Sequence, residues 1–382
     1  MANSFLTSKE IARQGLPVLQ DQLVFPALTN VNYSNTYMKK GSVIQVPRPA
    51  VFIADEFGGT INLQDINPFP VLVTMDKIAD VSVEVTATQM ALNVEDFNRE
   101  VLEPAVVAIA EKINNDGLGL YKWVPNYEGT AGVTPDALAD IANARKSLNN
   151  SKAPMMDRFA VWNPDADSKL SIVDQIVNAE KSGSTLALRE GAIGRVQGIN
   201  NYMSQAVRTH VAGGITALAD VTTTVDIANN TVDTLSGFTY SSAVLTSTAG
   251  VSTAKLLQGD LVKIGTKQYT VIEDTAAAIA GVVTAKLFPA LTANITGEAT
   301  TFADVTAGGH VANMAFNKNA FGFVTRPLEP AIGVDSSTTS FGGLTMRVTM
   351  GYDMDTKKQI MSIDVLYGWA PLYPELATRI LG

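Results

Sequence analysis

Alternating apolar and polar positions predict a β-hairpin two-thirds of the way along the chain, in the stretch GDLVKIGTKQYTVIED at residues 259–274. Its first strand places Val262 and Ile264 on one face, and its second strand places Tyr269 and Val271 on the same face. A hairpin with one apolar face is typical of small closed barrels. We therefore expect these four side chains to form the core of a barrel.

Helical spacing predicts a long helix in the first third of the chain. Asn93 is suited to cap it, and the acidic residues that follow suit the positive end of a helix. Pro104 must kink this helix or split it into two. The apolar positions of the helix include Phe97, Val101, Ile109 and Ile113.

Other patterns alternate between helix and strand. Thr134 and Pro135 are expected to open a second helix that runs to residue 150, and residues 163–181 to form a third. The apolar run FAVW predicts a strand at residues 159–162, and residues 194–207 predict either a strand pair or a loop followed by a strand. The mixture indicates an α+β host.

The N-terminal region is less regular. Residues 1–38 show partial helical spacing, which Gly15 and Pro17 are expected to interrupt. Strand-like runs at residues 42–46 and 71–75 then enclose a long excursion rich in proline and glycine. An excursion of this length inside a compact domain is often a functional loop.

The composition changes after residue 210. Residues 211–310 contain 19 threonines and only 12 charged residues, and all three tryptophans lie outside this range. Because threonine is β-branched and favours strands, we expect an all-β unit inserted into the host. Beyond it, residues 344–352 and 359–369 predict a long terminal hairpin.

Composition narrows the possible functions. Charged residues make up 17% of the chain, against about 25% in ordinary soluble domains. This low fraction fits either a large core or a surface buried against other copies of the chain. With a net charge of −9, the chain lacks the surplus of cations that binds a phosphate backbone, which argues against a DNA- or RNA-binding protein. With no cysteine, signal peptide or long apolar run, we expect a soluble intracellular protein without disulfides or membrane contact.

The chain offers little catalytic chemistry. His210 and His310 flank the threonine-rich region and are placed to meet at its base, but two histidines without an acidic pattern make a poor zinc site. Residues 163–168 lack the glycine and the final acid of a calcium loop. Asp353 and Asp355 lie in a predicted turn. Without a phosphate-binding or nucleotide-binding glycine motif either, we expect no catalytic, cofactor or metal site and no enzyme.

The order of these elements resembles the major capsid protein of tailed bacteriophages, in the podovirus coat-protein branch that carries an inserted domain. The stretches FAVWNPDADSKL, VQGINNYMSQAV and KLLQGDLVKIGTKQYTV are similar to segments of that family. The resemblance implies an α+β capsid fold with an N-arm, an E-loop, a P-domain with a spine helix, an A-domain and an inserted all-β barrel (I-domain).

The resemblance assigns a range to each part of this fold. The ranges are 1–38 for the N-arm, 39–80 for the E-loop, 81–125 for the spine helix and strand of the P-domain, 126–214 and 309–340 for the A-domain, 215–308 for the inserted barrel, and 341–382 for the long hairpin and terminal segment. In the family, the N-arm and the E-loop reach onto neighbouring subunits.

The resemblance also implies a function. Copies of the chain form hexamers and pentamers of an icosahedral shell, first as a procapsid and then as the virion capsid, around a dsDNA genome that is bound without sequence specificity. A portal and a separate scaffolding protein are expected partners, because no long scaffolding segment precedes the arm, and assembly is expected in the host cytoplasm. No lysine lies within residues 43–76, which argues against a covalent E-loop crosslink. The alternatives are a nanocompartment shell protein of the same fold and, more remotely, an enzyme with an unrecognised site.

One prediction concerns the expected E-loop. Phe52, Ile53 and Phe57 are apolar residues on an excursion with little core of its own, so we expect them to pack on a neighbouring subunit. Replacing Phe52 and Phe57 by serine should leave the melting temperature of the unassembled subunit nearly unchanged and weaken shell assembly, as followed by light scattering. An equal loss of stability and assembly would identify them as ordinary core residues.

Overall fold

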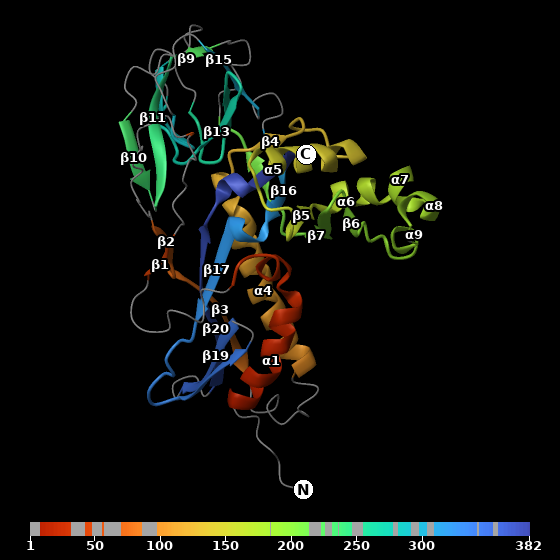
Figure 1. Cartoon of the computed structure of the whole chain (residues 1–382). Coiled ribbons are helices and arrows are strands. Elements are labelled where there is room, and N and C mark those ends of the chain that lie inside the picture. Colours follow the sequence, from red (N-terminus) through yellow and green to blue (C-terminus); the bar gives the residue numbers. More distant parts are fainter. Residues whose placement is uncertain are drawn as a thin grey trace.

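The computed structural model shows three packed parts (Figure 1). A sheet flanked by two helices forms the lower part in that view, a second sheet with short helices lies to the right, and an all-β part lies at the upper left. The structure describes residues 8–31, 43–47, 56, 70–85, 98–183, 185–213, 223–225, 231–235, 237–246, 255–277, 282–291, 298–303, 309–341, 344–353 and 358–382.

The lower part is an antiparallel sheet around the long strand β20 (Lys358–Pro371). Alternate residues of its strands are buried against α1 (Ser8–Gln22) and α4 (Glu103–Leu118), which together form one core. The predicted terminal hairpin is confirmed. The partners of β20 are β17 (Phe321–Arg326), β19 (Leu344–Asp353) and, along the opposite edge, β3 (Lys77–Val85), and β18 (Asp335–Phe341) extends the sheet beyond β19.

Helix α1 is not interrupted, so the break predicted at Gly15 and Pro17 is wrong. Pro17 has no backbone N–H, so the carbonyl of Arg13, four residues earlier, receives no helical hydrogen bond from it. Both residues are exposed, so that carbonyl can bond water instead. Gly15 is buried, and a Cβ added there would meet Met346 Cε at 2.9 Å and Leu102 Cδ1 at 3.3 Å. The close approach of α1 to the sheet and to α4 outweighs the weak local propensity.

The predicted long helix does split at Pro104. Asn98–Leu102 form a π-helical segment, and α4 then begins with Pro104 in its first turn, where no backbone N–H donor is needed. A 3₁₀-helix, η4 (Gly119–Trp123), follows α4. The short helix α2 (Val24–Ala27) packs beside α4.

The right-hand part is a sheet in the order β4-β21-β16-β5-β7-β6. Helices α5 (Leu138–Asn150) and α6 (Pro164–Ser171) bury apolar side chains against it. The predicted strands at residues 159–162 and 194–207 are confirmed. The strands are β4 (Tyr127–Glu128), β5 (Arg158–Trp162), β6 (Arg195–Val196), β7 (Ile199–Met203), β16 (Gly309–Asn317) and β21 (Ala377–Leu381), and β8 (Thr209–Val211) pairs with β16.

The second predicted helix begins later than the sequence indicates. Helix α5 begins at Leu138 rather than at residue 134, because the Asp140 carboxylate accepts hydrogen bonds from the backbone N–H groups of Asp136 and Ala137 and so caps the helix there.

The third predicted helix is wrong as one continuous helix. It divides into α6, α7 (Asp174–Val177) and α8 (Ala179–Ser182), and a further short helix, α9 (Leu186–Glu190), follows. The first break falls at Ile172 and Val173, two β-branched residues that follow Ser171, whose hydroxyl bonds back to the carbonyl of Ser168.

The all-β part lies between β8 and β16, which pair with each other, so the chain leaves and re-enters its host at one place. It is an antiparallel sheet in the order β10-β11-β14-β13-β12-β15-β9, curled so that β11 approaches β9. Within the described residues no ladder joins β10 to β9, so a closed barrel is not confirmed. The strands are β9 (Thr223–Val225), β10 (Thr231–Leu235), β11 (Phe238–Thr246), β12 (Leu261–Ile264), β13 (Lys267–Val271), β14 (Val282–Phe288) and β15 (Glu298–Phe302).

The hairpin β12–β13 has the predicted apolar face, and the base of its second face is buried as well, whereas Lys263 on that second face is exposed. One face joins the core of the all-β part. On the other face, Leu261 and Thr270 are opposite each other and both are buried, and the Thr270 hydroxyl donates to the carbonyl of Lys122 at 2.9 Å. The second face therefore seals the all-β part against its host.

The predicted strands around the proline-rich excursion form an antiparallel ladder, β1 (Val43–Pro47) with β2 (Pro70–Thr74). Its buried side chains pack with Phe238 and Phe288 of the all-β part and with residues of β17 and β20. Gly237 has φ +88° and a Cβ there would lie 2.5 Å from the carbonyl oxygen of Pro70, so only glycine allows this contact. The ladder thus lies where the lower and upper parts meet.

A matched pair of substitutions tests the hairpin core. Val262 is fully buried opposite Tyr269, whereas Thr266 is exposed in the turn. Val262→Asp should cost several kcal/mol, because a carboxylate there has no partner, and should give insoluble or assembly-defective protein. Thr266→Asp should change the unfolding free energy by no more than about 0.5 kcal/mol. Chemical unfolding and sedimentation measure both, and equal tolerance of the two would show that Val262 is not a core residue.

Candidate assembly surfaces and the domain junction

The structure offers no compact reaction centre among the residues it describes. Within those ranges, no group of three histidine, aspartate or glutamate side chains is placed to hold a metal ion. An open cleft of about 460 Å³ lies between α5, α7 and β6 and is lined by Ile176, Lys181 and Arg195 among others. None of the described helices is long and apolar enough to cross a membrane.

The base of the all-β part contains a buried polar network. His210 Nε2 and Asp260 Oδ1 lie 2.8 Å apart, and the Tyr121 hydroxyl lies 3.0 Å from His210 Nδ1. The rings of His210 and His310 are 5.2 Å apart on paired strands, as the flanking positions of the two histidines predict. The Asp260 carboxylate also accepts from the backbone N–H groups of Leu257 and Gly213. These contacts close the point where the chain leaves and re-enters its host.

Arg379 links three segments at this junction. It lies on β21, is fully buried, and donates from Nε to the carbonyl of Val124 at 2.9 Å. Its other nitrogens donate to the carbonyl of Gly259 at 2.5 Å and to the Thr270 hydroxyl at 2.8 Å, and the guanidinium lies over the Tyr121 ring. The C-terminal strand therefore holds the hairpin against the segment that follows α4. Sequence reasoning missed Arg379, because an isolated arginine near a terminus carries no signal of its distant partners.

A second charged centre lies at the end of α4. The Asp116 side chain is only 9% exposed, and the ammonium groups of Lys112 and Lys77 lie 2.9 and 3.3 Å from its oxygens. The Tyr367 hydroxyl donates to it at 2.7 Å. Burial opposes ionisation of Asp116, but the hydrogen bonds from Lys112 and Tyr367 and the two ammonium charges outweigh it and lower the pKa of Asp116. Burial and the Asp116 carboxylate raise the pKa of Tyr367. This centre fixes α4 to β3 and β20.

The residues singled out from the sequence fall into three groups. The E-loop residues Phe52, Ile53 and Phe57, and Phe97 and Asn93 of the long helix, lie outside the described residues. The other helix positions face the lower core: Ile109 and Ile113 are buried and Val101 is partly buried. Val262, Ile264, Tyr269 and Val271 are buried together in the all-β part.

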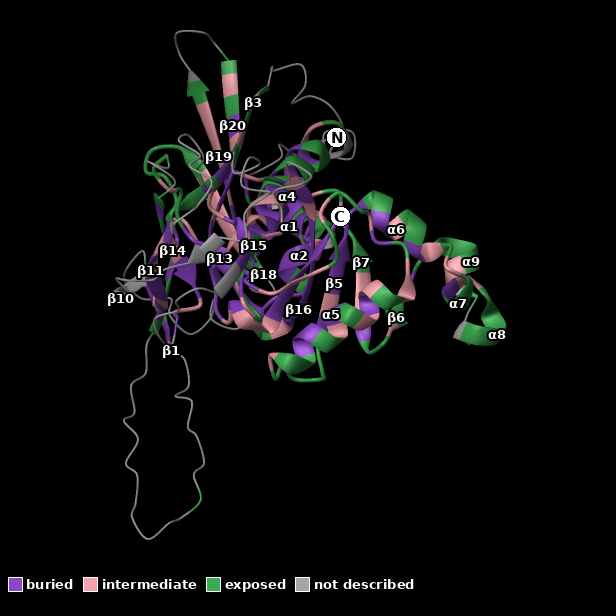
Figure 2. Cartoon of the chain, turned by 90° about the horizontal axis from the view of Figure 1, so that it is seen from above, coloured by how far each residue is buried: buried purple, intermediate pink, exposed green. Residues whose placement is uncertain are grey.

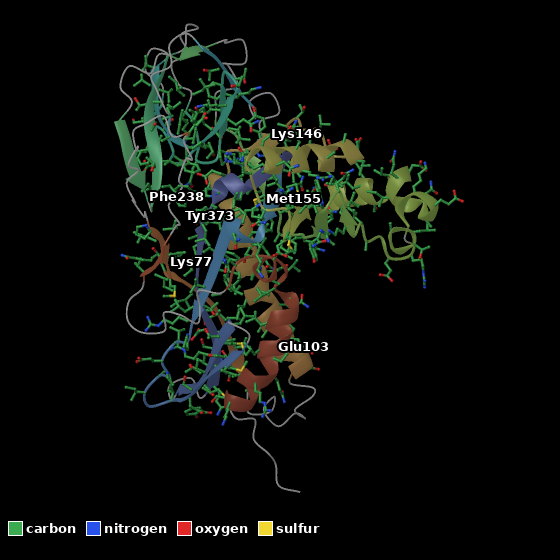
Figure 3. The ribbon with its side chains drawn as sticks, viewed as in Figure 1. Lys77, Glu103, Lys146, Met155, Phe238 and Tyr373 are labelled. Atoms are coloured by element: carbon green, nitrogen blue, oxygen red, sulfur yellow. The ribbon has the colours of Figure 1, made fainter. Side chains whose placement is uncertain are left out.

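Several exposed apolar side chains lie on the right-hand part. Leu188 on α9 is 68% exposed and Ile172, at the break between α6 and α7, is 74% exposed, and Figure 2 shows the short helices largely in the exposed colour. Met155 and Met156, before β5, are also exposed, and Figure 3 labels Met155.

Figure 3 places Phe238 and Tyr373 where the all-β part meets the lower sheet, and both pack in the core around β1 and β2. These two side chains are covered fully or in part, whereas the apolar side chains of the right-hand part are open to contact.

Comparisons with solved structures identify the fold. The solved structure of Mycobacterium phage Che8 has a TM-score of 0.53 and 15% identity, covering 94% of this chain and 90% of that chain. The capsid structure of the cyanophage P-SCSP1u has a TM-score of 0.44 and 11% identity, covering 90% of this chain and 84% of that chain. The likeness to the Che8 structure shows that this chain shares its fold, which mixes helices and sheets (α+β).

The sequence comparisons are more specific. Residues 270–382 match the family model of the P22 coat protein, gene protein 5. The major capsid protein of Acyrthosiphon pisum secondary endosymbiont phage 1 is 22% identical over 284 residues, covering 64% of this chain and 65% of the relative, just under two thirds of its length. Together with the shared fold, these matches confirm the resemblance to tailed-phage coat proteins.

Arg379 provides a test of the junction. Arg379→Met should lower the unfolding free energy of the unassembled subunit by about 3 kcal/mol or more, because the carbonyls of Gly259 and Val124 and the Thr270 hydroxyl lose a buried donor. Arg195→Met, at an exposed position on β6, should change it by no more than about 0.5 kcal/mol. Denaturant unfolding gives both values, and similar values for the two variants would mean that Arg379 does not hold the junction.

Proposed function

We propose that this chain is the major capsid protein of a tailed phage, and that its copies assemble into a closed icosahedral shell around the genome. The match of residues 270–382 to the coat-protein family carries the proposal. That stretch includes the long hairpin β19–β20 and strand β16, around which the lower and right-hand sheets are built. A structural role in the virion capsid follows from it.

The distribution of apolar surface supports this role. A shell subunit buries surface against many neighbours, so it needs fewer charges than a free monomer, and 17% of this chain is charged. Ile172 and Leu188 on the right-hand part, and Tyr352 and Ile360 near the end of the long hairpin, are exposed apolar side chains in two separate regions of the subunit. Weak contacts of this kind, repeated over a closed shell, add up to a stable assembly.

The finer assignments follow the same proposal. The ladder β1–β2 forms the base of the E-loop, with Phe52, Ile53 and Phe57 as its contacts to the neighbouring subunit, and α4 belongs to the spine helix of the P-domain. The sheet from β9 to β15 is the inserted domain. A scaffolding protein and a portal complete the assembly, which takes place in the host cytoplasm. A net charge of −9 suits a shell subunit that encloses DNA without binding it tightly.

Assembly is the direct test. Coexpressed with its scaffolding protein, the full chain should form closed particles that electron microscopy and light scattering detect. Thr266→Asp, at the exposed hairpin turn, should assemble in the same way and serves as the control. A discrete, stable monomer under these conditions would contradict the proposed function.

A further inference from the structure

Two aspartates lie directly opposite each other in the lower sheet. Asp80 on β3 is the register partner of Asp364 on β20, on the face that points away from α1 and α4. On the other edge of β20, Arg347 of β19 is the register partner of Asp364. Asp364 is buried and Asp80 is exposed, and like charges at directly opposed positions destabilise a ladder. The contacts of the pair indicate how the conflict is resolved.

The hydroxyl of Ser362 bridges the two carboxyl groups. Its Oγ lies 2.7 Å from Asp80 Oδ1 and 2.9 Å from Asp364 Oδ1. A serine hydroxyl has only one proton, so it gives a full hydrogen bond to each oxygen only if one of the two carboxyl groups is protonated and donates to it. A carboxyl group donates only when it is protonated. Two full hydrogen bonds among Ser362 Oγ, Asp80 Oδ1 and Asp364 Oδ1 therefore need two protons, one from the serine and one on a carboxyl group.

The surrounding charges also indicate one additional proton on the two carboxyl groups. Arg347 donates to Asp364 Oδ2 from Nε at 3.0 Å and from Nη2 at 2.5 Å, and neutralises one carboxylate. Farther along the same face, the ammonium of Lys358 lies 2.7 Å from the Glu84 carboxylate, so these two charges compensate each other. The lysine nearest to Asp80 along β3, Lys77, pairs with Asp116 on the helix-covered face. Within the described residues, Asp80 has no ion pair of its own, and the charge of Arg347 acts on both carboxyl groups.

The two aspartates are shifted in opposite directions. Burial and the hydrogen bond with Asp80 raise the pKa of Asp364 despite Arg347. For Asp80, the effect of burial is outweighed by hydrogen bonds with Asp364, Ser362 and Ser82, which lower its pKa. Opposite shifts in a contacting pair are the expected behaviour of two acids that hold one proton between them.

We propose that Asp80 and Asp364 share one proton in the folded protein and form a pH-sensitive lock between β3 and β20. Once that proton is lost, two carboxylates oppose each other beside a single arginine, and the β3–β20 ladder weakens. Strand β3 follows β2 almost directly, so the lock also secures the β1–β2 ladder to the lower sheet. The inference concerns the subunit itself and does not depend on the proposed function.

Infrared spectroscopy of the full chain tests for the shared proton. The informative quantity is a difference spectrum, because other carboxyl groups are partly protonated just above the pKa of a free aspartate. The wild-type spectrum minus that of Asp80→Asn, at the same pH, should contain the C=O stretch of one protonated carboxyl group. The difference against Asp364→Asn should contain the same band, and the difference against Glu84→Gln, on the same face of β3, should be much weaker. Burial also raises the pKa of Asp167, so Asp167→Asn identifies the band from that residue. A difference between wild type and Asp80→Asn that lacks the band overturns the proposal.

Stability measurements give an independent readout. A carboxyl group with a raised pKa stabilises the fold fully below its unfolded pKa and loses that contribution as pH rises through its folded pKa. Between these two values, the unfolding equilibrium constant of the wild-type subunit should rise about tenfold per pH unit relative to Asp80→Asn, because one additional proton is bound in the folded state. Glu84→Gln should follow the wild type. If the two curves run parallel, or if the band is absent and stability depends on added Mg²⁺, the pair does not hold a proton and the inference is wrong.

Discussion

The pairing of β20 on both of its edges is the constraint on which the rest of the lower fold depends. This 14-residue strand is buried along much of its length, so its backbone N–H and C=O groups must find partners in neighbouring strands. They find them in β3 on one edge and in β17 and β19 on the other. Strand β3 lies about 280 residues before β20 in the chain, so this pairing brings an early and a late segment of the chain together. Helices α1 and α4 and the terminal hairpin then pack into one core. The same requirement places Asp80 opposite Asp364.

The all-β part depends on its host through the second face of a hairpin. A hairpin with one apolar face would need only its own unit, but Leu261 and Thr270 are buried as well, against the segment after α4. Arg379 and the His210–Asp260 pair satisfy the polar groups that this contact buries. The orientation of the inserted unit is thus set by the C-terminal strand. That arrangement suits a subunit that must present several surfaces at fixed angles to its neighbours.

Three polar contacts join elements that are far apart in the chain. Asp116 joins α4 to β3 and β20, Arg379 joins β21 to the all-β hairpin, and Asp80 lies opposite Asp364 where β3 pairs with β20. The Arg379 and Asp364 side chains are buried, whereas Asp80 is exposed. Apolar contacts tolerate small shifts, whereas a buried hydrogen bond fails when its geometry changes. The buried hydrogen bonds of Arg379 therefore fix how the all-β part is set against its host.

Local pattern was sufficient for elements whose partners lie close by in the chain. The hairpin β12–β13, the terminal hairpin and the change to an all-β unit were predictable, because alternation and β-branched composition act over a few residues. The split at Pro104 was predictable for the same reason, since it follows from a missing N–H. The order of elements also carried the resemblance to coat proteins.

Tertiary structure decided what local pattern could not. Helix α1 continues through Gly15 and Pro17, because its packing against Met346 and α4 outweighs the weak helix propensity of these two residues. Tertiary structure buried the base of the second face of the hairpin, which alternation alone presents as polar. It also gave Arg379 and the Asp80–Asp364 pair their roles, since each depends on a partner more than 100 residues away in the chain. The sequence by itself determined the local elements and their order, and the tertiary structure decided which side chains meet across them, because those contacts depend on the packing of the whole chain.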